Sequence, residues 1–345
     1  MSTAADTGRP DRVPRRRSDH QAAPPADQPG DPRGDRRGDR TPARRVLVVG
    51  VTGMLGHAVL RELGDDPELD VHGLARSIDD RAGWFPRHLL ARIVPAVDVT
   101  RFDHVRRLVD ELRPDVVVNC VGVIKQRPDV QDAVPTVTLN ALFPHLLADA
   151  CAQVGSRLVH VSTDCVFSGR RGGYVEDDLP DPPDLYGRSK LLGEATGVAA
   201  LTLRTSIVGH ELTTNRSLVD WFLSQRGQVR GFTRAIYSGV TTVEFARLLR
   251  TVVLPRAELT GLFHVAAAPI TKYDLLRLVA EVYGWPGELV PDDEFACDRS
   301  MRADALAQVT GYRPPSWPDM IAAMHAARAR WALDQARPGL AGVPR

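Results

Sequence analysis

Short apolar runs alternate with amphipathic stretches from Arg44 onward. The run RRVLVVG (44–50) ends in glycine, as buried parallel strands often do. The stretch GMLGHAVLRELGDD (53–66) places its leucines and valines on one helical face. The same alternation continues along the chain, with strands predicted at 69–76, 91–99, 115–122, 157–167 and 200–209 and helices at 102–112, 138–155 and 186–198.

Strands that alternate with helices predict a parallel sheet covered on both faces, so we expect an α/β fold of the Rossmann type with a doubly wound sheet. After Gly209 the pattern is less regular, with helices predicted at 217–225, 241–249 and 270–284 and a strand at 261–268. We interpret this part as a smaller, interleaved C-terminal α+β lobe that binds substrate. The expected division is a Rossmann domain at 44–209 plus about 236–262, a substrate-binding lobe at 210–235 and 263–335, and a flexible C-terminus at 336–345.

The first 43 residues are rich in Arg, Asp, Pro and Gly and are predicted to be a disordered tail. They lack the apolar centre of a secretory signal, and a solvated tail is favoured over a basic arm that binds an acidic partner. The whole chain of 345 residues has a formal net charge of +1, which argues against a nucleic-acid or membrane-surface role. No run approaches the roughly 18 apolar residues of a membrane span. We therefore expect a cytoplasmic protein, and a homodimer stays open.

The four cysteines show neither a CxxC pair nor the spacing of metal ligands. We expect free thiols and no metal site.

The turn after the first predicted strand reads GVTGMLG, with Gly50, Gly53 and Gly56 in a GxxGxxG pattern. A strand that leads through such a turn into a helix presents backbone N–H groups to a pyrophosphate, and glycine permits close approach. This spacing is one residue wider than the GxGxxG fingerprint. In its strand–turn–helix context it predicts a dinucleotide site rather than a merely structural turn.

The end of the second predicted strand bears on the choice of nicotinamide coenzyme. It carries Arg76 and has no carboxylate before Asp79, which favours NADP(H) over NAD(H), although NAD(H) stays open. Asp98, at the end of the third predicted strand, can reach an adenine amine. Its alternative role is to cap the helix that begins near Thr100.

Tyr186 and Lys190 lie four residues apart on a predicted helix, so both side chains can point into one cleft. A nearby ammonium is expected to lower the pKa of the phenol, which would make Tyr186 an effective proton donor to a carbonyl oxygen. Lys190 is one of only three lysines in an arginine-rich chain, and its compact charge also suits ribose hydroxyls. Upstream, Ser162 and Thr163 end a predicted strand, where a hydroxyl can bind the same oxygen or cap the next turn.

Other residues have two interpretations. Lys125, after the fourth predicted strand, either grips a substrate phosphate or is a surface lysine. Trp221 and Phe222 can stack on a base or sugar, but core packing is favoured.

Four segments together resemble the extended short-chain dehydrogenase/reductase superfamily, and within it the dTDP-4-dehydrorhamnose reductase family. They are GVTGMLG (50–56), STDCVFSG (162–169), GYVEDDLPDPPDLYGRSKLLGE (173–194) and LRTSIVG (203–209). The C-terminal DRSMRADALAQVTGYRPPSW is similar to the closing stretch of that family, and the resemblance covers about residues 45–325.

This resemblance implies an oxidoreductase of carbohydrate or polysaccharide biosynthesis. Hydride would pass from NAD(P)H to the C4 ketone of a nucleotide-activated 6-deoxy sugar, with Thr163, Tyr186 and Lys190 as the catalytic triad and Tyr186 as proton donor. The coenzyme contacts it implies, beyond Tyr186 and Lys190, are Gly50, Thr52, Gly53, Met54, Leu55, Gly56, Asp98, Val99, Cys120, Val121 and Gly122. The sugar-side positions it implies are Asp164, Val166 and Phe167, while Cys165 replaces the family's tyrosine.

Other functions stay open. A nucleotide-sugar epimerase of the same superfamily needs only the tyrosine and bound NAD. A 4,6-dehydratase carries Asp-Glu after the threonine, and Cys165 in the Glu position disfavours dehydration. A third candidate is a non-catalytic, NADP-binding regulatory subunit, because a fold can persist without its chemistry.

Overall fold

The computed structural model describes residues 43–124 and 128–336, and side chains within 43–124 and 130–332. The tail predicted at 1–43 lies outside the described residues except for residue 43, as does the C-terminus predicted at 336–345 except for the backbone of residue 336. Lys125 also lies outside them.

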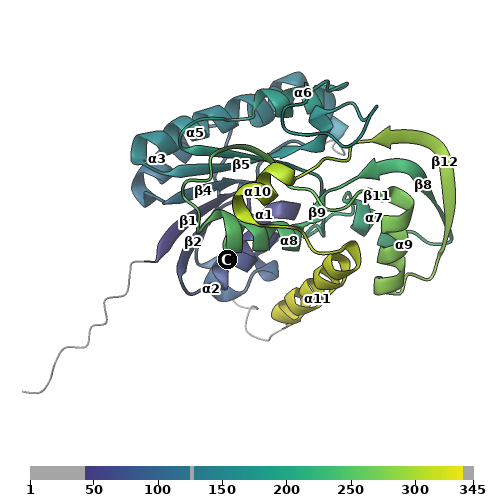
Figure 1. Cartoon of the computed structure of the whole chain (residues 1–345). Coiled ribbons are helices and arrows are strands. Elements are labelled where there is room, and N and C mark those ends of the chain that lie inside the picture. The colour runs from purple at the N-terminus through teal and green to yellow at the C-terminus, as the bar shows by residue number, and fades with distance from the viewer. Residues whose placement is uncertain (1–42, 125–127, 337–345) are drawn as a thin grey trace, which may run out of the picture. The chain divides into compact units, whose positions relative to one another are not determined.

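Seven parallel strands form the main sheet, as predicted for a Rossmann-type α/β fold (Figure 1). Their order is β10-β6-β5-β4-β1-β2-β3. The strands are β1 (Arg44–Val49), β2 (Leu69–Leu74), β3 (Ile93–Val94), β4 (Val116–Asn119), β5 (Arg157–Thr163), β6 (Ala200–Thr205) and β10 (Gly261–His264). The order reverses between β1 and β4, and in doubly wound sheets ligands bind at the carboxyl ends of the strands at this point.

The sheet is buried on both faces. In β1, Val46 and Val48 belong to the core on one side, while Leu47 and Val49 belong to the core on the other, and all four are fully buried. This explains why β1 reads as a continuous apolar run. One layer contains α3 (Phe102–Leu112), α5 (Phe143–Val154) and α6 (Leu185–Leu192), and the other contains α1 (Met54–Gly64) and α8 (Thr242–Leu248) (Figure 1).

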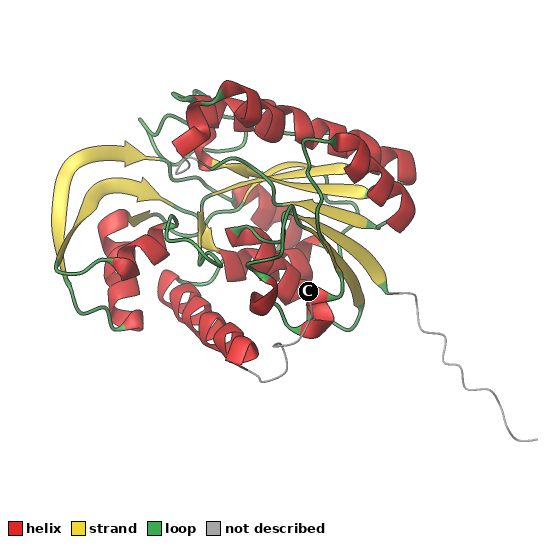
Figure 2. Cartoon of the chain, turned by 180° about the vertical axis from the view of Figure 1, so that it is seen from behind, coloured by secondary structure: helices red, strands yellow, loops and turns green. Residues whose placement is uncertain are grey.

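Most of the remaining elements lie beyond the carboxyl ends of β5 and β6. A three-stranded sheet has the order β11-β8-β12, with β8 (Gln228–Tyr237), β11 (Ile270–Thr271) and β12 (Glu288–Asp298) (Figure 2). Two short strands, β7 (Ile207–Val208) and β9 (Val240–Thr241), pair with each other. The other helices are α2 (Arg87–Leu90), α4 (Ala133–Val137), α7 (Leu218–Ser224), α9 (Lys272–Tyr283), α10 (Asp304–Thr310) and α11 (Trp317–Ala336).

Two helix starts follow directly from the sequence. The Thr241 side chain accepts a hydrogen bond from the Glu244 backbone N–H, and Thr271 accepts one from that of Asp274, so each threonine caps the helix that it precedes. The third strand differs from its prediction: it has only two residues, because the chain turns at Ala96, whose φ is 60°. Within the described residues, no helix is both long and apolar enough to cross a membrane.

Candidate active site

The glycine turn between β1 and α1 has the geometry of an anion cradle. Gly50 has a φ of 89°, and α1 begins after Gly53 with no side chain capping its first N–H groups and no acidic residue in its first turn. A Cβ on Gly56 would lie 2.1 Å from the Gly50 carbonyl oxygen. Free N–H groups at a positive helix end, reached over residues without side chains, fit a pyrophosphate.

The residues around this turn differ in exposure. Thr52 and Met54 are half-buried and Gly53 is exposed, whereas Leu55 packs in the core. Across the turn lies the loop Cys120-Val121-Gly122, which follows β4; a Cβ on Gly50 would lie 2.8 Å from Val121 Cγ2. The structure therefore brings the predicted contacts after β1 and β4 together at the point where strand order reverses.

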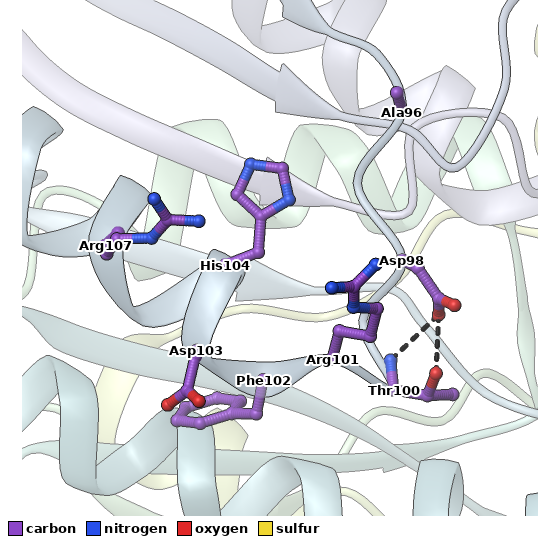
Figure 3. Close-up of a pocket in the computed structure, with 8 residues that line it drawn as sticks. All are labelled: Ala96, Asp98, Thr100, Arg101, Phe102, Asp103, His104 and Arg107. Carbon is purple, nitrogen blue, oxygen red and sulfur yellow. Dashed lines mark hydrogen bonds between the residues drawn. The ribbon is translucent and has the colours of Figure 1, made fainter.

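Asp98 forms a local turn. Its Oδ1 accepts hydrogen bonds from the Thr100 backbone N–H, at 3.0 Å, and from the Thr100 hydroxyl, at 2.7 Å. These bonds, with the charges of Arg76 and Arg101, lower the pKa of Asp98. The predicted helix cap is therefore wrong: Asp98 closes a turn before α3, whose N-cap residue is Arg101 and which has no side-chain cap. The contact of Asp98 and Val99 with adenine stays a prediction. Arg101, His104 and Arg107 are among the residues that line the adjoining cavity of about 620 Å³. Figure 3 shows how these side chains lie.

Helix α6 holds Tyr186 and Lys190 against the end of β5. The Asp184 side chain caps α6 by accepting a hydrogen bond from the Gly187 N–H at 2.8 Å. A Cβ on Gly187 would lie 2.3 Å from the Cys165 carbonyl oxygen, so the helix approaches the β5 loop closely. Thr163 is close enough to the Tyr186 phenol to lower its pKa, and the Thr163 hydroxyl donates to Asp164 Oδ1 at 3.1 Å. Lys190 Nζ donates to the Val161 carbonyl oxygen at 2.7 Å. Thr163, Tyr186 and Lys190 are therefore gathered around one strand end.

The charge relation expected between Tyr186 and Lys190 is wrong in this structure. Burial raises the pKa of Tyr186 above its ordinary value, the charges of Cys165 and Asp164 raise it further, and the neighbouring Thr163 only partly opposes them. Burial also lowers the pKa of Lys190 to about 8, against the opposing attraction of Glu194. Removal from water is the largest cause of both shifts, and the Lys190 ammonium is directed at Val161.

Asn140 was not anticipated from the sequence. It is fully buried in a π-helical turn (Thr138–Leu142) that leads into α5. Its Oδ1 accepts from the Val123 N–H at 2.8 Å, and its Nδ2 donates to the Ser189 hydroxyl at 3.2 Å. Asn140 thereby connects the loop after β4 with α6. The only signal in the sequence is a polar amide within the apolar run TLNALFPHLL.

The predicted sugar-side residues follow β5. Val166 and Phe167 are fully buried, and the Phe167 ring stacks on Tyr174 with 4.1 Å between centroids. Asp164 is the polar member of the three. Burial raises its pKa, while the charge of Arg299 opposes this. Arg299, also missed from the sequence, donates through Nε to the Phe167 carbonyl oxygen at 2.9 Å.

Two aromatic residues in α7 have different environments. Phe222 is fully buried, with its ring 4.3 Å from that of Trp285, which confirms core packing. For Trp221 the core prediction is wrong, because its side chain is 40% exposed.

The cysteines at positions 120, 151, 165 and 297 form no disulfide with one another. Burial raises the pKa of Cys120 to about 12. Among the residues that the structure describes, no group of three or more His, Cys, Asp or Glu is arranged to hold a metal ion.

Residues 44–326 match the family model described as the RmlD substrate binding domain. The chain is 32% identical over 269 residues to methionine adenosyltransferase 2 subunit beta of Danio rerio, and the aligned region covers 74% of this chain and 79% of that protein. It is 31% identical over 268 residues to a probable low-salt glycan biosynthesis reductase of Haloferax volcanii, covering 72% of this chain and 83% of that protein. The dTDP-4-dehydrorhamnose reductase of Bacillus anthracis, solved in complex with NADP, superposes with a TM-score of 0.67 at 22% identity, covering 82% of this chain and 99% of that one.

Proposed function

The chain belongs to the RmlD substrate binding domain family, within the extended short-chain dehydrogenases/reductases, and on this premise we propose that it is an NAD(P)H-dependent reductase of a nucleotide-activated 4-keto-6-deoxy sugar. The observation that carries this proposal is the gathering of Thr163, Tyr186 and Lys190 at the end of β5. A role in carbohydrate biosynthesis follows from this substrate class.

The glycine turn and the loop after β4 would hold the coenzyme. The uncapped N-terminus of α1 would bind the pyrophosphate, because Gly50 and Gly56 leave no room for a side chain. Arg76 is exposed at the end of β2 and would bind a 2′-phosphate, which favours NADP(H) over NAD(H). Lys190 would bind ribose hydroxyls. When bound, the reduced nicotinamide supplies a hydride to the substrate carbon.

Tyr186 donates the proton. Its raised pKa keeps the phenol protonated at neutral pH, which is the state that a donor requires. The alkoxide that forms at C4 is a much stronger base than a phenolate, so the proton passes to it readily. The Thr163 hydroxyl, which donates to Asp164 Oδ1 at 3.1 Å in this structure, would turn to the same substrate oxygen and hold it in place.

A mutation of Tyr186 tests the proposal. Tyr186→Phe is expected to retain NADPH binding and to lower kcat by about a hundredfold or more, because the general acid is lost. The assay follows NADPH absorbance with dTDP-4-keto-6-deoxy sugars as substrates. Tyr312→Phe is the matched control, because its hydroxyl donates to Glu244 at 2.8 Å, in another part of the fold. Near wild-type turnover by Tyr186→Phe would show that another group donates the proton.

The relationship to methionine adenosyltransferase 2 subunit beta favours a second candidate, a non-catalytic regulatory subunit. The two candidates differ in measurable ways. A regulatory subunit would bind NADP and co-elute in gel filtration with a methionine adenosyltransferase catalytic subunit of the same organism, without turning over any ketosugar. Turnover that depends on Tyr186 would favour the reductase.

A further inference from the structure

The segment that follows β8 contacts the segment that follows β6. Beyond Tyr237, the last residue of β8, the Val240 N–H donates to the Ser206 carbonyl oxygen at 2.9 Å. A Cβ on Gly239 would lie 1.8 Å from the same oxygen. Ser206 follows Thr205, which is paired with Thr163, the neighbour of Asp164, across β5 and β6. The strand end that carries Tyr237 thus lies near the candidate active site.

The hydroxyl of Tyr237 is buried and has no hydrogen-bond partner among the described residues. Its ring stands edge-on to Trp317, with 6.1 Å between centroids. Burial and the charge of Asp164 raise the pKa of this phenol, so it is a protonated donor at neutral pH. A buried donor without an acceptor is unfavourable and is typically satisfied by a ligand or an ordered water.

Asp164 lies within electrostatic reach of two phenols, Tyr186 on α6 and Tyr237 on β8. The charge of Arg299 lowers the pKa of this carboxyl, and the Arg299 backbone N–H donates to the Ile236 carbonyl oxygen at 2.9 Å, next to Tyr237. Strands β5 and β8 and the segment after β12 therefore converge on Asp164. Asp164 Oδ1 accepts from the Thr163 hydroxyl at 3.1 Å, but a carboxylate can accept further hydrogen bonds, while the Tyr237 hydroxyl is a free donor.

We propose that Tyr237 is a substrate-binding residue, whose hydroxyl donates to a sugar hydroxyl that in turn donates to Asp164. A sugar hydroxyl both donates and accepts, so it complements this pair, whereas a phosphate has no proton to give a carboxylate. The inference rests on the proposed function. It adds that two phenols contact the sugar ring: Tyr186 at the reacting oxygen and Tyr237 at a second sugar oxygen.

Binding of nucleotide sugars to Tyr237→Phe tests this assignment without turnover. Isothermal titration in saturating NADP⁺ would compare dTDP-glucose, UDP-glucose and GDP-mannose with dTDP, UDP and GDP. For the sugar nucleotides that the wild type binds, the variant is expected to show a Kd about three to ten times higher, with the free nucleotides unchanged. The thermal midpoint without ligand should stay equal or rise, since an unpaired buried hydroxyl has been removed. Tyr312→Phe should leave every Kd unchanged.

Three outcomes would overturn the assignment. Equal sugar-nucleotide affinities in Tyr237→Phe and wild type would show that the hydroxyl does not touch the sugar, and the proposed function would still stand. An equal loss of affinity for dTDP-glucose and dTDP would place the contact at the nucleotide. If the wild type binds none of the sugar nucleotides, the proposed function itself fails, and this inference fails with it.

Discussion

Replacement of Lys190 by methionine offers a quantitative test of the site's electrostatics. In the folded protein the pKa of Lys190 is lowered from 10.5 to about 8, chiefly by burial. The unfolded chain therefore binds more protons between about pH 8 and pH 10.5, and the folded protein gains stability as pH rises through this window. Below about pH 8, burial of the charged ammonium lowers the free energy of unfolding by its full amount. The difference between the two pKa values puts that amount at about 3 kcal/mol.

The free energies of unfolding of wild type and Lys190→Met would be measured in urea between pH 6 and pH 9. The wild type is expected to gain about 1 kcal/mol relative to the variant from pH 7 to pH 9. Other titrating groups cancel in this difference. Arg188→Met, at an exposed position of the same helix, is the control and should show a difference independent of pH. A flat difference for Lys190→Met would mean that the ammonium is solvated, which would refute the account of its burial.

Two further substitutions test the coenzyme site. Gly56→Ala is expected to abolish NADPH binding or folding, measured by titration and circular dichroism, because the new Cβ would lie 2.1 Å from a backbone oxygen. The control is Gly83→Ala, whose new Cβ would meet nothing within 4 Å. Wild-type NADPH affinity in Gly56→Ala would contradict the close packing of the turn. Arg76→Ser is expected to raise the Kd for NADPH about tenfold and to leave that for NADH unchanged, because the lost ion pair is specific to the 2′-phosphate. Equal changes for both coenzymes would exclude that contact.

The regular half of the fold could be predicted because its strands are buried on both faces. Each such strand is a short apolar run, and each crossover helix shows one apolar face, so the pattern determines the element type. Strands β8 and β12 were missed for the opposite reason. Residues of β12 such as Asp293, Glu294 and Phe295 are exposed, so no apolar run marks the strand. Helix α11 was also missed.

Some residues of the candidate site were likewise predictable from the sequence, and others were not. The glycines and the Tyr186–Lys190 pair are local patterns within one turn or helix, and the sequence therefore predicts them. Tyr237 and Arg299 reach Asp164 only because β8 and the segment after β12 lie side by side. No spacing along the chain encodes that proximity. The pKa of Tyr186 was mispredicted because the degree of burial depends on the whole fold.

The edge strand β10 has a consequence for biosynthesis. It pairs with β6 through register partners such as Gly261 with Leu201, some 60 residues earlier in the chain. A ribosome must therefore release the chain through residue 264, more than three quarters of the 345 residues, before β6 gains this neighbour. Until then the nascent chain carries an open strand edge, which can pair with other chains. Truncations that end between β9 and β10 should be prone to aggregation in cells.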